Sequence, residues 1–331
     1  MNKKMVLGIG VVLAIALVVL AVNFGAQSSF FTLAASKENN TIRVGWINTF
    51  VESAYVSQPL IRTQILADNG IEGKFTSFLT GPPMSEAAAA KNIDVMLMGW
   101  APTSFLLEKD PSWEVVGKFA YFDDCLLAKT GSGIESVADF NGKKFGVPFG
   151  SGPYAVVYQQ LAKNNLVPNK DVELVNISPT DFAAALSANQ VDGVGWGKST
   201  LVALESKGLA HEIVCVKDYA IITMSKDFIK NNPNTAKAFI DSIKEASLYF
   251  AQNQEEVYSW VAEDAKMDLG VVKKISYTES NFDAKTLNDV DLSLSAEDIM
   301  DIQSRVDFSK EQKILKNGFD FNSKVDQSLI K

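Results

Sequence analysis

Residues 143–197 read KKFGVPFGSGPYAVVYQQLAKNNLVPNKDVELVNISPTDFAAALSANQVDGVGWG, and they contain an alternation of strand and helix signals. The apolar run 144–149 is typical of a strand, the following GSGP of a turn, and 154–164 has helical spacing of apolar residues. Strand-like runs return at 172–177 and 191–196, with a short helix predicted between them. This alternation predicts a parallel sheet covered by helices, with ligands at the carboxyl ends of the strands.

The glycine turn at 150–153 lies where a predicted strand ends and a predicted helix begins. The first turn of a helix has backbone N–H groups without intrahelical partners, and the helix dipole makes the potential there positive. The sequence therefore predicts an anion-binding turn formed by Gly150, Ser151 and Gly152. Tyr154 and Trp196 are expected to face the same crevice.

A similar order of strands and turns occurs earlier in the chain, from residue 41 to residue 100. Strands are predicted at 41–46, 75–79 and 93–100, and a helix at 53–69. A single glycine turn is usually an ordinary chain reversal, but five such strand ends in order favour a binding cleft. The turns of this first segment contribute the candidate binding residues Asn48, Thr49, Phe50, Thr80, Gly81 and Trp100.

Several short motifs resemble the solute-binding proteins of nitrate-, sulfonate- and taurine-type ABC importers, with the taurine and aliphatic sulfonate members nearest. The motifs are GKKFGVPFGS (142–151) with Tyr154, DVELVN (171–176), AAAL (183–186) and VDG (191–193). The resemblance implies an α/β, two-lobed periplasmic-binding-protein-like fold of type II. Each lobe would be a mostly parallel sheet flanked by helices, with the ligand cleft between the lobes. The sequence departs from the family pattern at Trp196-Gly197-Lys198, where relatives have a proline.

The resemblance also implies a division of the chain. Residues 41–123 would form the first part of lobe 1, residues 124–222 lobe 2, and residues 223–331 a helical return that packs on lobe 1. The predicted crossings between the lobes are strand-like segments at 115–129 and 212–224. A polar linker at 36–40 would precede the folded part.

The amino-terminal residues 1–35 contain an uncharged apolar run, 5–22, preceded by Lys3 and Lys4. Such a run is either a signal peptide or an N-terminal membrane anchor, and its length slightly favours an uncleaved anchor. In both cases the folded part is expected outside the cytoplasm, in the periplasm or on the outer face of the cytoplasmic membrane.

Acidic residues near the predicted cleft leave the ligand open. Glu52, Asp124 and Asp192 are about as easily explained as solvated charges or helix caps, and the tryptophans as core residues. Asp124 is the strongest candidate, because taurine-type relatives have an acid near the corresponding crossing. An anion-binding turn opposite a carboxylate and aromatic rings fits a zwitterion such as taurine. Dominance of the acids would instead fit a cationic amine or a pyrimidine of the thiamine-precursor type.

Composition excludes several other functions. With 31 basic and 39 acidic residues the net charge is −8, which argues against a nucleic-acid surface. The two cysteines, Cys125 and Cys215, could form one disulfide if their strands are neighbours, but two buried free thiols are the expected state. With a single histidine, His211, and no Walker motif, the sequence predicts no metal site, no cofactor and no enzyme. An enzyme on this fold would have to use Cys125 or Lys198, and a sensor domain is the remaining alternative.

The expected partners follow from the resemblance. They are a taurine- or alkanesulfonate-like solute, an ABC permease with its ATPase, and the membrane through the N-terminal segment. The chain is expected to be a monomer.

Overall fold

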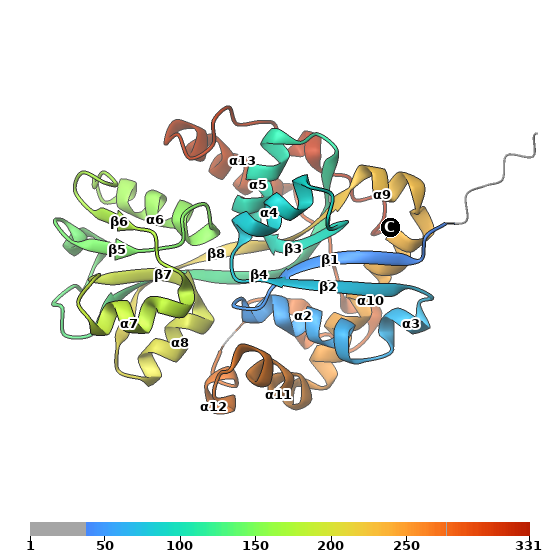
Figure 1. Cartoon of the computed structure of the whole chain (residues 1–331), viewed down its shortest axis with the longest axis horizontal. Helices are drawn as coiled ribbons and strands as arrows, with labels where there is room; N and C mark the ends of the chain where they lie inside the picture. The colour runs from blue at the N-terminus through green and yellow to red at the C-terminus, as the bar shows by residue number, and fades with distance from the viewer. Residues whose placement is uncertain (1–37, 276) are drawn as a thin grey trace, which may run out of the picture. The chain divides into compact units, whose positions relative to one another are not determined.

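Two long antiparallel strands, β4 (Trp113–Lys129) and β8 (Ala210–Ser225), form the centre of the sheet in the computed structural model (Figure 1), which describes residues 38–275 and 277–331. Both coincide with the predicted crossings. They belong to one eight-stranded sheet, in the order β2-β1-β3-β8-β4-β7-β5-β6. The other strands are β1 (Thr41–Ile47), β2 (Glu72–Phe78), β3 (Val95–Gly99), β5 (Lys144–Gly146), β6 (Glu173–Val175) and β7 (Gly193–Gly197).

The two halves of the sheet repeat one arrangement. β1 lies between β2 and β3 and is parallel to both, and β5 lies in the same way between β6 and β7. The third strand of each set is antiparallel to one of the central strands, β3 to β8 and β7 to β4. The α/β class and the internal correspondence are thus confirmed. Because β4 and β8 run through both halves, the two predicted sheets are joined into one.

Helices cover both faces of this sheet, with α4, α5, α6 and α13 on one face and α2, α7 and α8 on the other (Figure 1). Their apolar sides pack against the strands, as the sequence periodicity predicts. The helices are α2 (Val51–Arg62), α3 (Ile65–Asp68), α4 (Gly81–Ala89), α5 (Trp100–Lys109), α6 (Gly152–Lys163), α7 (Phe182–Ser187), α8 (Lys198–Ser206), α9 (Lys226–Asn231), α10 (Pro233–Gln252), α11 (Gln254–Ala265), α12 (Leu269–Val272) and α13 (Ala296–Glu311).

The single helix predicted at 53–69 is divided into α2 and α3. Thr63 has an extended backbone, with φ −110° and ψ −177°, and so ends α2. Its hydroxyl donates a hydrogen bond of 2.7 Å to the carbonyl of Pro59, which gives a terminal carbonyl of the helix a partner. The chain then turns and resumes as α3.

The hydrophobic core has three clusters. One lies in the half of the sheet that contains β1, β2 and β3, and it includes Phe239 of α10 and Ile302 of α13. Two smaller clusters lie in the other half, one around Phe145 and one around Phe182. Much of the segment after β8 therefore packs on the first half of the sheet.

The structure corrects the expectation of two free thiols, because Cys125 and Cys215 form a disulfide. The two residues are directly opposite each other in the β4–β8 pair, and their Cα atoms are 4.0 Å apart. This pair contains three register shifts, at Val115/Gly117, Lys118/Ala120 and Leu126/Leu127. Residue counting along the two strands could not have revealed the pairing for that reason.

The predicted signal peptide or anchor at 1–35 lies outside the described residues, as do residues 36 and 37 of the linker. Across residues 38–275 and 277–331, no helix combines the length and the apolar composition needed to cross a membrane.

Candidate ligand-binding site

A cavity of about 40 Å³, here called the deep cavity, lies where strand ends from both halves of the sheet meet the first turns of α4, α5 and α6. The structure brings together on its wall six of the predicted binding residues: Phe50, Gly81, Asp124, Ser151, Gly152 and Trp196. The remaining lining residues are Ile47, Gly99, Pro102, Phe122, Pro153 and Gly197. Apolar and aromatic surface with few polar groups is the usual composition of a small-molecule site.

Among the described residues, Asp124 is the one charged side chain on the wall of the deep cavity. It projects from β4, is 1% exposed, and its Oδ2 has no hydrogen-bond partner within residues 38–275 and 277–331. Burial raises the pKa of Asp124 well above its ordinary value, and the nearby Asp218 raises it further. Arg305 acts in the opposite direction. A ligand cation would therefore meet an unsatisfied acceptor here.

Asp218 of β8 and Arg305 of α13 lie behind Asp124 as a buried ion pair. Arg305 Nη1 donates to Asp218 Oδ1 at 3.2 Å, and the backbone N–H of Tyr219 donates to the same oxygen at 2.8 Å. Arg305 also donates to the carbonyl of Lys217 and to Asp301 Oδ2, both at 2.9 Å. Burial raises the pKa of Asp218, whereas Arg305 opposes the shift. Asp218 Oδ2, like Asp124 Oδ2, has no hydrogen-bond partner in the described part of the chain.

Gly152, the first residue of α6, lies against both carboxyl groups. A Cβ atom at this position would be 2.9 Å from Asp124 Oδ2 and 3.1 Å from Asp218 Oδ2. Both distances are shorter than ordinary van der Waals contacts, so only glycine leaves room for the two oxygens. The two unpartnered oxygens therefore converge on one point beside the helix terminus.

Glu52 lies in the first turn of α2 and does not line the deep cavity. It is 1% exposed, and no described residue forms a hydrogen bond with its Oε2. Burial raises the pKa of Glu52 to about 7; Asp123 also raises it, while Lys198 lowers it. Lys198 forms an ion pair with Asp123 at 3.8 Å. Lys198 is thus paired with Asp123, the residue that precedes Asp124 in the sequence.

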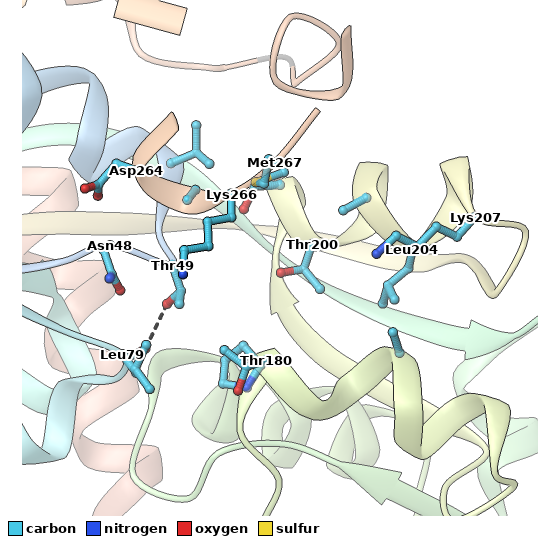
Figure 2. A pocket seen from close by; sticks show the side chains of 16 residues that line it. Asn48, Thr49, Leu79, Thr180, Thr200, Leu204, Lys207, Asp264, Lys266 and Met267 are labelled. Carbon is cyan, nitrogen blue, oxygen red and sulfur yellow. Dashed lines mark hydrogen bonds between the residues drawn. The ribbon is translucent and has the colours of Figure 1, made fainter. Parts of the chain in front are cut away.

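Trp196 joins the two halves of the sheet at the deep cavity. Its Nε1 donates a hydrogen bond of 3.2 Å to the carbonyl of Thr49, from the end of β7 to the turn before α2. Asn48 and Thr49 line a second, larger pocket of about 360 Å³, here called the outer pocket (Figure 2). In that pocket the Thr49 hydroxyl donates to the carbonyl of Leu79 at 2.8 Å, and Lys266 and Thr180 are close by (Figure 2).

The anion-binding turn has fewer free donors than the sequence suggests. The Ser151 hydroxyl donates to the carbonyl of Pro148 at 2.6 Å and accepts from the N–H of Tyr154 at 3.2 Å, so it caps α6. Prolines, which have no N–H, occupy positions in the first turns of all three helices at the deep cavity: Pro82 and Pro83 in α4, Pro102 in α5 and Pro153 in α6. The acceptor on Asp124 is the more prominent polar feature.

Besides Asn48, Thr49 and Glu52, five more predicted residues lie apart from the deep cavity. Thr80 precedes α4 without a side-chain capping bond, Gly150 lines a separate pocket of about 430 Å³, and the Tyr154 hydroxyl lies 3.1 Å from that of Tyr158. Trp100 is 1% exposed and lies behind the wall, with its ring centre 5.9 Å from the Arg305 guanidinium. Asp192 precedes β7, at the opposite end from the cavity, and its Oδ2 accepts from the N–H of Lys144 at 2.9 Å.

Sequence reasoning missed Asp218 and Arg305. Asp218 lies in the predicted return crossing, and its position in a strand that neighbours Asp124 is the one signal that could have marked it. Arg305 lies in the helical return, where the resemblance fades, and no local pattern connects it with Asp124.

The cysteine and histidine side chains, which enzymes often use in catalysis, contact other groups of the chain. The two cysteines are joined in the disulfide, and His211 Nε2 lies 2.9 Å from the carbonyl of Ile134. In the part of the chain that the structure describes, no three or more histidine, cysteine, aspartate or glutamate side chains are arranged to hold a metal ion.

Known proteins share both sequence and fold with this chain. It is 24% identical over 252 residues to a protein of Brucella abortus (strain 2308) described as a binding protein, which covers 72% of this chain and 76% of that protein. It is also 24% identical over 239 residues to the taurine-binding periplasmic protein of Escherichia coli (strain K12), with 70% and 72% covered.

Among solved structures, the fold is similar to the alkanesulfonate-binding protein SsuA from Xanthomonas axonopodis pv. citri bound to MOPS. The TM-score is 0.71 and the identity 19%, with 88% of this chain and 99% of that chain covered. The desulfurization enzyme DSZB has a similar fold, with a TM-score of 0.65 and 14% identity, and 88% and 98% covered. The family model described as NMT1/THI5 like matches residues 82–257, more than half of the chain. The chain therefore has a periplasmic-binding-protein fold and belongs to the NMT1/THI5-like family.

Proposed function

We propose that this chain is the solute-binding protein of an ABC importer, which captures a small solute between the two halves of the sheet and delivers it to a permease and its ATPase. The family, the relatives and a cavity lined from both halves support this role. In this proposal, residues 41–123 and 124–222 move as two lobes about the β4–β8 crossings, and residues 223–331 move with the first.

The same proposal places the protein outside the cytoplasm as a monomer. The Cys125–Cys215 disulfide supports an oxidising compartment, where such bonds persist. The N-terminal segment 1–35 would direct the chain there as a signal peptide or hold it at the membrane as an anchor.

Asp124 is the observation that indicates the ligand. A buried carboxylate oxygen without a partner is costly, and an ammonium group is the ligand group that would satisfy it. Phe50, Phe122 and Trp196 on the same wall add aromatic faces that favour a cation. We therefore assign the solute an amine, and a taurine-like zwitterion is the first candidate.

The size of the deep cavity requires it to open for such a ligand. A volume of about 40 Å³ accepts roughly three water molecules, which is less than taurine needs. The Trp196–Thr49 hydrogen bond crosses between the two halves, so its release would let them separate. After closure the solute would occupy an enlarged cavity.

A cationic amine or an amino-pyrimidine is the second candidate. The prolines in the first turns of α4, α5 and α6 favour it, because they remove N–H donors that a sulfonate would use. In that case the ligand would have no anionic end.

Three ligands that differ by one group test this assignment. Isothermal titration of the full chain with taurine, ethanesulfonate and ethylamine compares the zwitterion with each of its ends. Taurine is expected to bind at least about tenfold more tightly than ethanesulfonate, since a charge-assisted hydrogen bond to Asp124 contributes about 1.5–3 kcal/mol. Ethylamine as the tightest ligand would instead support the cationic candidate.

Asp124→Asn should remove the preference for the amine. Asp192→Asn is the matched control, because Asp192 precedes β7 at the end of the strand that is remote from the deep cavity. Equal affinities for taurine and ethanesulfonate in the unmodified chain would refute the role of Asp124. Binding of none of the three would refute this class of solute.

A further inference from the structure

We propose that Asp218 and Arg305 determine the charge of the ligand: the buried set of Asp124, Asp218 and Arg305 lacks one positive charge, which a proton supplies in the empty cavity and the ligand's ammonium group supplies in the complex. Binding of an amine would thus release a proton. The inference rests on the proposed function, because it concerns how the same cavity selects its solute.

The geometry of the oxygens is the first support. Asp124 Oδ2 and Asp218 Oδ2 are both buried without a hydrogen-bond partner among the residues that the structure describes, and both lie about 3 Å from the position that a Cβ atom would take at Gly152. Two ionised carboxylates can only accept hydrogen bonds, so neither satisfies the other. One proton held between them would turn one carboxyl group into a donor and give both oxygens a partner.

The charges around the pair are the second support. Arg305 reaches Asp218 from α13 and balances this buried carboxylate. It also pairs with Asp301 of the same helix, whose side chain is 40% exposed to solvent and lies outside the buried set. Glu52 from α2 raises the pKa of Asp124 further where Glu52 is ionised. Trp100 of α5 lowers the pKa of Asp218, and α6 contributes Gly152 rather than a cation. Lys198 at the start of α8 is engaged by Asp123. Burial and repulsion by Asp218 raise the pKa of Asp124. The pair in the empty cavity therefore keeps a proton that two carboxyl groups exposed to water would lose at the same pH.

The exchange conserves charge and atoms. In the empty cavity, one protonated carboxyl group, one carboxylate and Arg305 sum to zero. When a ligand ammonium enters beside Asp124, it lowers the proton affinity of the pair, the proton passes to solvent, and two carboxylates face two cations. A ligand without an amine has no such effect. Asp218 is in this view a positioning residue, which acts on the ligand through Asp124.

Calorimetry tests the exchange in the full chain without any substitution. Titration of taurine at about pH 6, in two buffers of different ionisation enthalpy, should show release of up to one proton per ligand. Over the range in which the pair titrates, the dissociation constant should fall by up to about tenfold for each unit of pH increase. Ethanesulfonate should release no proton.

Asp218→Asn is the informative variant, because its amide can donate to Asp124 Oδ2 while Arg305 keeps the carbonyl oxygen. It should abolish proton release and lower the ratio of taurine to ethanesulfonate affinity by at least about tenfold, since Asp124 is then balanced by Arg305. A merely structural role for Asp218 would weaken both ligands equally. Taurine binding without proton release in the unmodified chain would refute the exchange and leave the proposed function intact.

A measurement without ligand keeps the two proposals separate even if none of the three solutes binds. Infrared spectroscopy of Glu52→Gln, which removes the carboxyl group whose pKa is raised to about 7, should show the carbonyl stretch of a protonated carboxyl group at about pH 6. The band should disappear in Glu52→Gln/Asp218→Asn. Its absence in Glu52→Gln would overturn the shared proton whatever the ligand.

Discussion

Glu52 shows how a single buried acid makes the stability of the fold depend on pH. It is 1% exposed, and the pKa is raised from 4.5 to about 7, chiefly by burial. A carboxyl group whose pKa is raised in the folded state stabilises the fold fully below its unfolded pKa. That contribution is lost as the pH rises through the folded value. The relevant window therefore extends from about pH 4.5 to just above pH 7.

Glu52→Gln is expected to remove this pH dependence. The free energy of unfolding of the variant, relative to the unmodified chain, should increase by about 3 kcal/mol between pH 4.5 and pH 8, because the glutamine does not ionise. Urea unfolding at several pH values measures the difference. A constant difference across the range would show that Glu52 does not titrate as described.

At the residue scale, prediction from sequence was uneven for a physical reason. Trp196 could be found because it lies at a strand end, whose position follows from local patterns, and Asp124 because it lies in a predicted crossing where the resemblance implies an acid. Asp218 and Arg305 matter through contacts across the β4–β8 pair and from α13. Such contacts depend on register and tertiary packing, which no local pattern encodes.

At the scale of elements, the start of α6 limits where the carboxyl groups of Asp124 and Asp218 can lie. Ser151 caps this helix and Gly152 begins it, so the two carboxyl groups lie against the helix terminus. Pro153 follows in the first turn and removes one donor. The helix start therefore holds the acids in place with little room for adjustment.

Gly152→Ala should weaken ligand binding by about tenfold or more. The added Cβ would lie 2.9 Å from Asp124 Oδ2, so the carboxyl group must move from its position at the cavity. Gly197→Ala is the matched control, since it adds the same methyl group to the same cavity with its nearest neighbours at 3.9 and 4.0 Å. Isothermal titration compares the two, and equal effects would attribute the loss to cavity volume alone.

The elements themselves were largely predictable, because apolar strands and helical spacing alternate clearly in both halves. Asp192 was misplaced relative to the cavity because β7 begins at Gly193, which puts the aspartate at the amino end of the strand. The split between α2 and α3 depends on the backbone of Thr63, and the disulfide on register shifts in β4 and β8. Both are details of geometry rather than of composition.

For the whole molecule, the repeated arrangement of β1–β3 and β5–β7 explains why the site lies between the halves. The carboxyl ends of β1 and β3 in one half and of β7 in the other lie at the deep cavity, beside β4. The turns that follow these strands therefore meet there. β4 and β8 are continuous through the meeting point and are joined by the Cys125–Cys215 disulfide. Relative movement of the halves would therefore bend this pair, while contacts such as Trp196–Thr49 open and close.

Trp196→Phe tests this contact across the halves. The phenylalanine keeps an aromatic ring on the cavity wall but cannot donate to the Thr49 carbonyl. A net hydrogen bond contributes about 1 kcal/mol, so closure should weaken and the ligand should dissociate about fivefold faster. Trp260→Phe is a suitable control, because Trp260 stacks on Tyr249, away from the deep cavity. Stopped-flow measurement of ligand dissociation should separate the two variants. An unchanged rate in Trp196→Phe would mean that this hydrogen bond does not hold the closed form.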